Sequence, residues 1–177
     1  MKKILYIFTL IYLIGLASCT PNKPYVYRGL PKTYELAYEE IYGHCYDSVP
    51  QAVVALDLYS EGLELDKNHR IKGTGYNLYL SDIFVPDSLL EEGKYRHAQT
   101  GEAFTFLPGR DYDGTPHGMY ILNIEEDKVI QIQVLDSGSF VYRNDSLLFT
   151  LYYKNAYGYR AVYSPTFHGT LIPWLKK

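Results

Sequence analysis

Cysteine is scarce in this chain of 177 residues, which contains only Cys19 and Cys45. There is no Cys-x-x-Cys pair, and no two of the five histidines have a zinc-type spacing, so the common zinc motifs are excluded. The basic residues are scattered, which argues against nucleic acid as a partner. A Gly-x-Ser-x-Gly elbow and a phosphate-binding loop are also missing. We therefore expect no cofactor and no metal, and no motif supports an enzyme.

Long hydrophobic runs are missing as well. The longest apolar segment runs from Ile4 to Leu16, about thirteen residues, whereas a membrane-spanning helix needs ~20. The segment follows Lys2-Lys3 and ends in Leu16-Ala17-Ser18-Cys19, a pattern that resembles the bacterial lipoprotein signal. The resemblance implies that residues 1–18 are a signal peptide and that Cys19 becomes the lipidated N-terminus. We expect a protein held to a membrane by its acyl chains.

Removing residues 1–18 leaves 159 residues, a length that suits one domain. The net charge of −3 becomes about −5, because Lys2 and Lys3 are lost with the signal. Residues 19–33 are rich in proline and read as a lipidated tether. Residues 34–177 are expected to form a single domain.

From residue 50 onward, short apolar or alternating runs are separated by Gly, Asp and Asn. Such spacing predicts an all-β fold, with an antiparallel β-sandwich as the first choice and a calycin-like β-barrel as the alternative. The predicted strands cover residues 52–59, 76–85, 94–97, 103–107, 119–124, 129–135, 139–142, 147–153, 160–163 and 167–172.

Residues 34–46 are ambiguous. Tyr34, Tyr38 and Tyr42 fall at helical spacing, whereas tyrosine favours strands. We expect a short N-terminal helix over residues 33–40, followed by a strand over residues 40–46. Cys45 is interpreted as a small buried side chain.

Glycine followed closely by an aromatic residue recurs along the chain, for example at Gly75-Tyr76, Gly118-Met119-Tyr120 and Gly138-Ser139-Phe140. Together with the signal and the Gly73–Leu80 segment, this pattern resembles small all-β lipoproteins of the Bacteroidetes type, most of which have no known function. The resemblance implies an outer-membrane position. Surface-exported members of that group usually carry acidic residues soon after the lipidated cysteine, and residues 20–25 have none. This favours a periplasm-facing domain, with surface exposure as the alternative.

Tyrosine is abundant, with 20 residues, of which Tyr6 and Tyr12 belong to the signal. Half-buried sheet surface explains most of them. The alternative is a glycan-binding face, because tyrosine rings stack on sugars while their hydroxyls form hydrogen bonds. The candidate ligand-binding residues form a dense C-terminal group, to which the single tryptophan is added: Tyr152, Tyr153, Tyr157, Tyr159, Tyr163 and Trp174.

The longest well-marked loop runs from Pro108 to Gly118. Its Asp111 and Asp113 are weak metal candidates, because a calcium loop needs six to eight oxygen ligands. An Asp-Gly turn is the simpler explanation.

Three functions remain open. The first is a non-enzymatic envelope lipoprotein that contacts a protein partner as an accessory or structural component, which predicts an exposed apolar patch. The second is a tyrosine-lined module that binds glycan or a small ligand, which predicts a groove. The third is a hydrolase, which predicts clustered acidic groups with perturbed pKa values in a cleft.

Overall fold

The structure is a computed structural model that describes residues 29–176. The predicted signal peptide, Cys19 and most of the predicted tether lie outside these residues. The all-β prediction is confirmed, since the described chain contains strands and no α-helix. None of its segments is therefore a helix of the length and apolarity needed to cross a membrane.

Seventeen strands are present in residues 29–176: β1 Thr33–Tyr34, β2 Leu36–Gly43, β3 Ala52–Tyr59, β4 Leu63–Leu65, β5 Ile71–Gly73, β6 Gly75–Val85, β7 Gly93–His97, β8 Thr105–Phe106, β9 Arg110–Tyr112, β10 Thr115–His117, β11 Met119–Glu125, β12 Lys128–Val134, β13 Ser137–Arg143, β14 Ser146–Lys154, β15 Arg160–Tyr163, β16 Thr166–His168 and β17 Ile172–Leu175.

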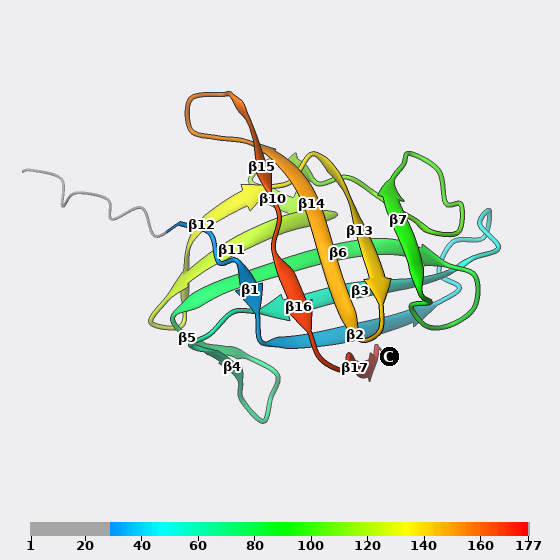
Figure 1. Ribbon diagram of the computed structural model, residues 1–177, viewed down its shortest axis with the longest axis horizontal. Coiled ribbons are helices and arrows are strands. Elements are labelled where there is room, and N and C mark those ends of the chain that lie inside the picture. Colours follow the sequence, from blue (N-terminus) through cyan, green and yellow to red (C-terminus); the bar gives the residue numbers. More distant parts are fainter. Residues whose placement is uncertain (1–28, 177) are drawn as a thin grey trace, which may run out of the picture.

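Thirteen of these strands form one curled sheet that closes to a half-barrel (Figure 1). We call β12-β11-β6-β3-β2-β17 the first arm and β7-β13-β14-β16-β1, with β15, the second arm. The two arms cross steeply, and β8 joins them. The main core lies between the arms, where Leu56 and Leu78 of the first arm belong to the same apolar cluster as Phe140 and Phe149 of the second.

The position of β3, the central strand of the first arm, explains its mostly apolar sequence. All eight residues of β3 are buried, because it lies between β2 and β6 and both of its faces are covered. Such a strand reads as a continuous apolar run. The neighbouring β6 contains a bulge, since the pair Val54↔Ile83 is followed by Leu56↔Leu80. Asp82 lies in this bulge with φ of 51°. The extra residue changes the direction in which the neighbouring side chains point.

The predicted helix over residues 33–40 is wrong, because this segment forms β1 and β2. In β2 the side chains alternate, with Ala37 in the main core and Tyr38 packed on a second cluster. The period of two therefore prevails over the helical spacing of the tyrosines. Cys45 is exposed rather than buried, because the strand ends at Gly43 before reaching it.

Most strand pairs are antiparallel, as expected, but the sheet is mixed. The parallel pairs are β1 with β16, β2 with β17 and β7 with β8. Two of them dock residues 33–43 against residues 166–175, so strands from both ends of the described chain lie side by side.

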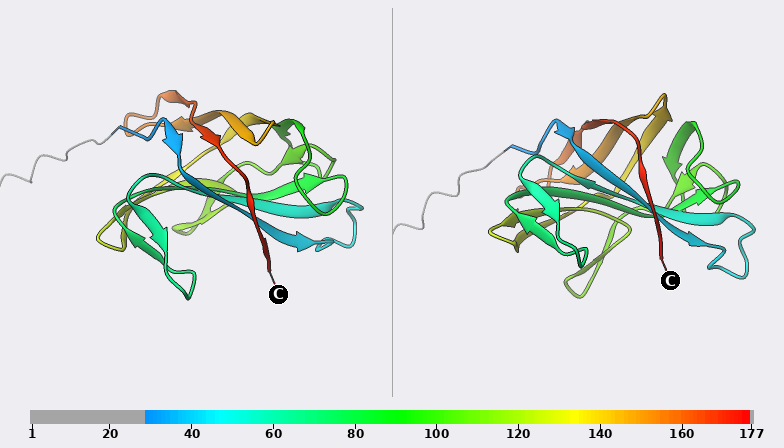
Figure 2. Two further views of the ribbon diagram at one scale, coloured as in Figure 1. Left: turned by 60° about the horizontal axis from the view of Figure 1, so that its bottom comes forward. Right: turned by 90° about the horizontal axis from the view of Figure 1, so that it is seen from below.

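The first arm has a second face, turned away from the core, which we call the outer face. The β4–β5 hairpin covers one end of it and stands off the sheet on the side opposite the second arm (Figure 2). Under this hairpin Tyr59, Leu63 and Ile124 form a small separate core. The rest of the outer face carries the groups described next.

Candidate functional site

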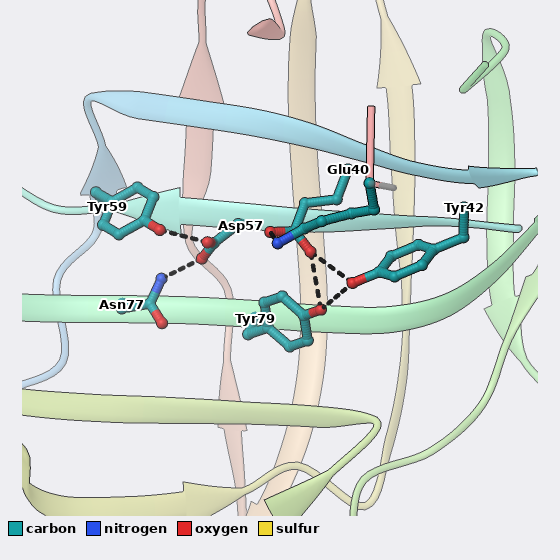
Figure 3. A network of polar contacts seen from close by, with 7 residues as sticks. Glu40, Tyr42, Asp57, Tyr59, Asn77 and Tyr79 are labelled. Atoms are coloured by element: carbon teal, nitrogen blue, oxygen red, sulfur yellow. Dashed lines mark hydrogen bonds and ion pairs between the residues drawn. The ribbon is translucent and has the colours of Figure 1, made fainter. Parts of the chain in front are cut away.

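A buried polar network lies on the outer face (Figure 3). Its member Tyr59 also belongs to the small core under the β4–β5 hairpin. The side chains of the network come from alternate positions of β2, β3 and β6, so the strand period places them on one face. We call this set the carboxylate network; it consists of Glu40, Tyr42, Asp57, Tyr59, Asn77, Tyr79 and Lys176.

Glu40 is the centre of one half of the network and is only 3% exposed. Its Oε2 accepts hydrogen bonds from the hydroxyls of Tyr42 at 2.8 Å and Tyr79 at 3.1 Å. These two hydroxyl oxygens lie 3.2 Å apart. Its Oε1 pairs with Lys176 Nζ at 2.7 Å. Burial raises the pKa of Tyr42 to about 12, so this hydroxyl stays protonated and donates to Glu40.

Asp57 is the centre of the other half. Its Oδ1 accepts a hydrogen bond from Asn77 Nδ2 at 2.5 Å, and its Oδ2 accepts one from the Tyr59 hydroxyl. Asn77 also donates to the Leu58 carbonyl oxygen at 3.0 Å. Burial raises the pKa of Asp57 to about 6, with a smaller contribution from the nearby Glu40 carboxylate, and the two hydrogen bonds oppose the shift.

Both carboxylates are buried and have their partners within the protein. Each oxygen of Glu40 and Asp57 has a partner, and no buried side-chain nitrogen or oxygen in residues 29–176 lacks one. A general acid or base must reach a proton of its substrate. These groups instead reach each other, so the arrangement holds β2, β3, β6 and the C-terminal segment together.

Aromatic rings extend the network across the outer face. The ring of Tyr79 lies 5.2 Å from that of Tyr120 on β11. Trp174 packs edge-on against Tyr38 at 6.3 Å and stacks on His69 at 4.3 Å. Lys176 Nζ lies 3.7 Å from the centre of the Trp174 ring, within cation–π distance.

The far edge of the first arm is apolar and exposed. Within the described residues β12 pairs only with β11, so its other edge carries no strand. Val129, Ile130 and Ile132 are 51%, 46% and 42% exposed. Val129 and Ile132 lie opposite Ile124 and Leu122, which places both on the outer face.

The six predicted ligand-binding residues do not form one surface. Tyr163 is buried, and its hydroxyl lies 2.8 Å from the Tyr34 hydroxyl and donates to the Pro31 carbonyl oxygen at 2.9 Å. Tyr153 packs against the main core, and Arg160 lies over the Tyr152 ring at 4.1 Å. Trp174 lies on β17, at the opposite edge of the sheet path from this group.

Tyr157 and Tyr159 are the exposed members, at 85% and 72%. They stand on the turn between β14 and β15, where Asn155 Oδ1 accepts hydrogen bonds from both of their backbone N–H groups at 3.0 Å.

The predicted loop of residues 108–118 contains the β9–β10 hairpin. Asp111 Oδ1 accepts a hydrogen bond from Gly114 N–H at 2.8 Å, the bond expected of an Asp-Gly turn. Asp113 is exposed in the same turn, with φ of 51°. Between residues 29 and 176, no three His, Cys, Asp or Glu side chains gather closely enough to hold a metal ion.

Sequence reasoning missed the carboxylate network, although its signal is present. Tyr38-x-Glu40-x-Tyr42, Asp57-x-Tyr59 and Asn77-x-Tyr79 each place polar and aromatic residues two positions apart. In strands this spacing puts them on one face. Comparison with known proteins identifies no relative: no family model matches the sequence, and no curated protein or solved structure matches the chain.

Proposed function

We propose that this protein is a non-enzymatic envelope lipoprotein that acts by binding a protein partner through the edge of β12. Cys19 carries the lipid, residues 19–33 tether the domain, and the domain faces the periplasm from the outer membrane. The observation that carries the proposal is the edge of β12 that pairs with no further strand in residues 29–176, on a strand with three exposed aliphatic side chains.

An edge of this kind is unusual in a protein that works alone. Unpaired strands template the addition of another strand, and proteins ordinarily protect them with charges, proline or bulges. β12 reads Lys-Val-Ile-Gln-Ile-Gln-Val, with its one charge at the end, on Lys128, and a bulge at Ile130. Residues 131–134 are therefore the regular, uncharged part of this edge. The partner that fits is an extended segment with apolar residues at alternate positions, which pairs with β12 through its backbone.

The buried carboxylate network supports the non-enzymatic part of the proposal. A hydrolase needs acidic groups that face a cleft, and the two carboxylates of this network do not, because Glu40 is 3% exposed and Asp57 8% exposed. The hydrogen bonds of these carboxylates end within the protein. Their role is to fix the sheet that presents β12.

The proposal is tested by the native size of the lipidated protein, extracted from membranes in a mild detergent. We compare the wild type with Ile132→Lys and Leu148→Lys. Leu148 is a matched control, because it is 49% exposed but lies on β14, which is paired on both sides. We expect a complex larger than the single chain that Ile132→Lys disrupts and Leu148→Lys preserves. A single-chain size for the wild type, or equal effects of the two variants, would contradict the proposal.

A further inference from the structure

A cleft of about 310 Å³ lies between the β6 bulge, the segment after β7 and the β9–β10 hairpin. It is separate from the β12 edge and does not depend on the proposed protein contact. These three segments supply its polar lining: Asp82, Gln99, Arg110, Tyr112 and His117. The volume is at the lower end of the range for small-molecule sites.

The cleft is lined by the carboxylate of Asp82, which hydrogen bonds hold in place. Asp82 Oδ1 accepts a hydrogen bond from the Tyr46 hydroxyl at 2.6 Å, and Oδ2 accepts one from Ser81 Oγ at 2.8 Å. The backbone of Asp82 is left-handed, with φ of 51°, as part of the β6 bulge. Each carboxylate oxygen accepts more than one hydrogen bond, so the held group has acceptor capacity left for a ligand.

The cleft is also lined by a guanidinium that hydrogen bonds hold in place. Arg110 Nη2 donates to Gln99 Oε1 at 2.6 Å, and Nη1 donates to the Tyr112 hydroxyl at 3.2 Å. Arginine has five N–H donors, so donors remain for a ligand after these two bonds. The Tyr112 and His117 rings form a T-shaped pair with their centroids 5.3 Å apart, and Tyr112 is 54% exposed.

Two glycines fix the base of the hairpin that carries Arg110 and Tyr112. A Cβ at Gly109 would lie 2.1 Å from the Met119 carbonyl oxygen, and one at Gly118 would lie 2.5 Å from the Pro108 carbonyl oxygen. These close backbone approaches leave no room for a side chain. The lining groups are therefore held on a rigid base before a ligand arrives, which lowers the entropic cost of binding.

We propose that this cleft binds a saccharide unit. A simple anion would be attracted by Arg110 but repelled by Asp82, and a simple cation the reverse, whereas neutral vicinal hydroxyls donate to a carboxylate and accept from a guanidinium together. The exposed Tyr112 ring offers the apolar face on which a pyranose stacks, and its hydroxyl is already oriented by Arg110. This places glycan recognition at β9–β10 rather than at the tyrosines of β14–β15.

The test is saturation-transfer NMR on the full lipidated protein in a detergent without sugar headgroups. The probes are chitotriose, cellotriose, mannotriose and galactotriose, with glycine and glutamate as charged non-sugar probes. We compare the wild type with Tyr112→Ala, Asp82→Asn and Tyr157→Ala. Tyr157→Ala is the matched control, because it removes an exposed tyrosine outside the cleft. Asn tolerates the left-handed backbone at position 82, so Asp82→Asn keeps the bulge.

We expect transfer to at least one trisaccharide, at least about tenfold weaker binding in Tyr112→Ala and Asp82→Asn, and wild-type binding in Tyr157→Ala. Unchanged melting curves show that the variants are folded. No transfer to any trisaccharide, transfer that survives Tyr112→Ala, or transfer to the amino acids alone would overturn the proposal.

Discussion

Lys176 Nζ pairs with Glu40 Oε1 at 2.7 Å and thereby joins the end of the described chain to its second strand. The two side chains differ in burial, since Glu40 is 4% exposed and Lys176 is 32% exposed. The register of β17 on β2, with Trp174 opposite Glu40, brings the two groups together. The C-terminal segment therefore neutralises a carboxylate that the sheet has already buried.

This pairing predicts coupled effects on stability. Lys176→Met should lower the free energy of unfolding by about 1–3 kcal/mol, because it leaves a buried carboxylate without its cation. Glu40→Gln should also be destabilising, but the double variant should lose less than the two single losses combined, by about 1 kcal/mol. Urea unfolding of the four proteins measures this coupling. Strict additivity would show that the pair contributes nothing.

Asp57 predicts a specific dependence of stability on pH. Its pKa rises from the usual 3.8 to about 6 on folding, so between these values the folded state binds more protons than the unfolded state. The stabilisation that Asp57 gives the folded state is therefore fully present below pH 4 and is lost as the pH rises through 6. Two pKa units correspond to roughly 3 kcal/mol.

The check is urea unfolding at pH 4 and pH 7 for the wild type and Asp57→Asn. The amide accepts from Asn77 and donates to the Tyr59 hydroxyl, so it keeps both contacts. From pH 4 to pH 7 the free energy of unfolding of the wild type should fall by roughly 3 kcal/mol more than that of the variant. If the stabilities of the two proteins changed equally with pH, a group other than Asp57 would be responsible for the pH dependence.

Tyr163 is predicted to be structural. Its hydroxyl bonds to Pro31 and Tyr34, so Tyr163→Phe should cost about 1–2 kcal/mol by leaving buried polar atoms unpaired. Tyr157→Phe, at a side chain that is 85% exposed, should change the melting temperature little. Equal melting temperatures for the two variants would contradict this assignment.

The hairpin base is predicted to reject a side chain at one glycine and accept it at another. Gly118 has φ of 74°, and a Cβ added there would lie 2.5 Å from a backbone oxygen, whereas Gly114 has φ of 82° and open space around it. Both alanine variants carry the left-handed strain of roughly 1–2 kcal/mol, and Gly118→Ala adds a steric clash. Thermal melts should therefore rank Gly118→Ala below Gly114→Ala; the reverse order would show that the base is soft.

Local pattern predicts much of the fold. The strands over residues 52–59 and 160–163 have the bounds expected from sequence, because a buried apolar run and turn residues on each side determine them locally. The helix over residues 33–40 failed because its tyrosines satisfy both periods, and only the pairing of β2 with β3 and β17 decides between them.

The site was harder to predict, for a physical reason. Alternation shows that Glu40 and Tyr42 share a face, but it does not show that Asp57 and Tyr79 lie beside them. That follows from the order β6-β3-β2. Lys176 reaches the network through a parallel pairing between distant segments, which leaves no local signal in the sequence. The exposed edge of β12 is likewise visible only once the neighbours of every strand are known.

The most direct test of the central claim is site-specific photo-cross-linking in intact cells. A photoreactive phenylalanine analogue is placed at Ile132, on the β12 edge, or at Leu148, the equally exposed control on β14. We predict a discrete protein adduct from position 132, whether with another protein or with a second copy of the chain, and none of that mass from position 148. No adduct at position 132, or the same adducts from both positions, would contradict the claim that β12 is the contact surface.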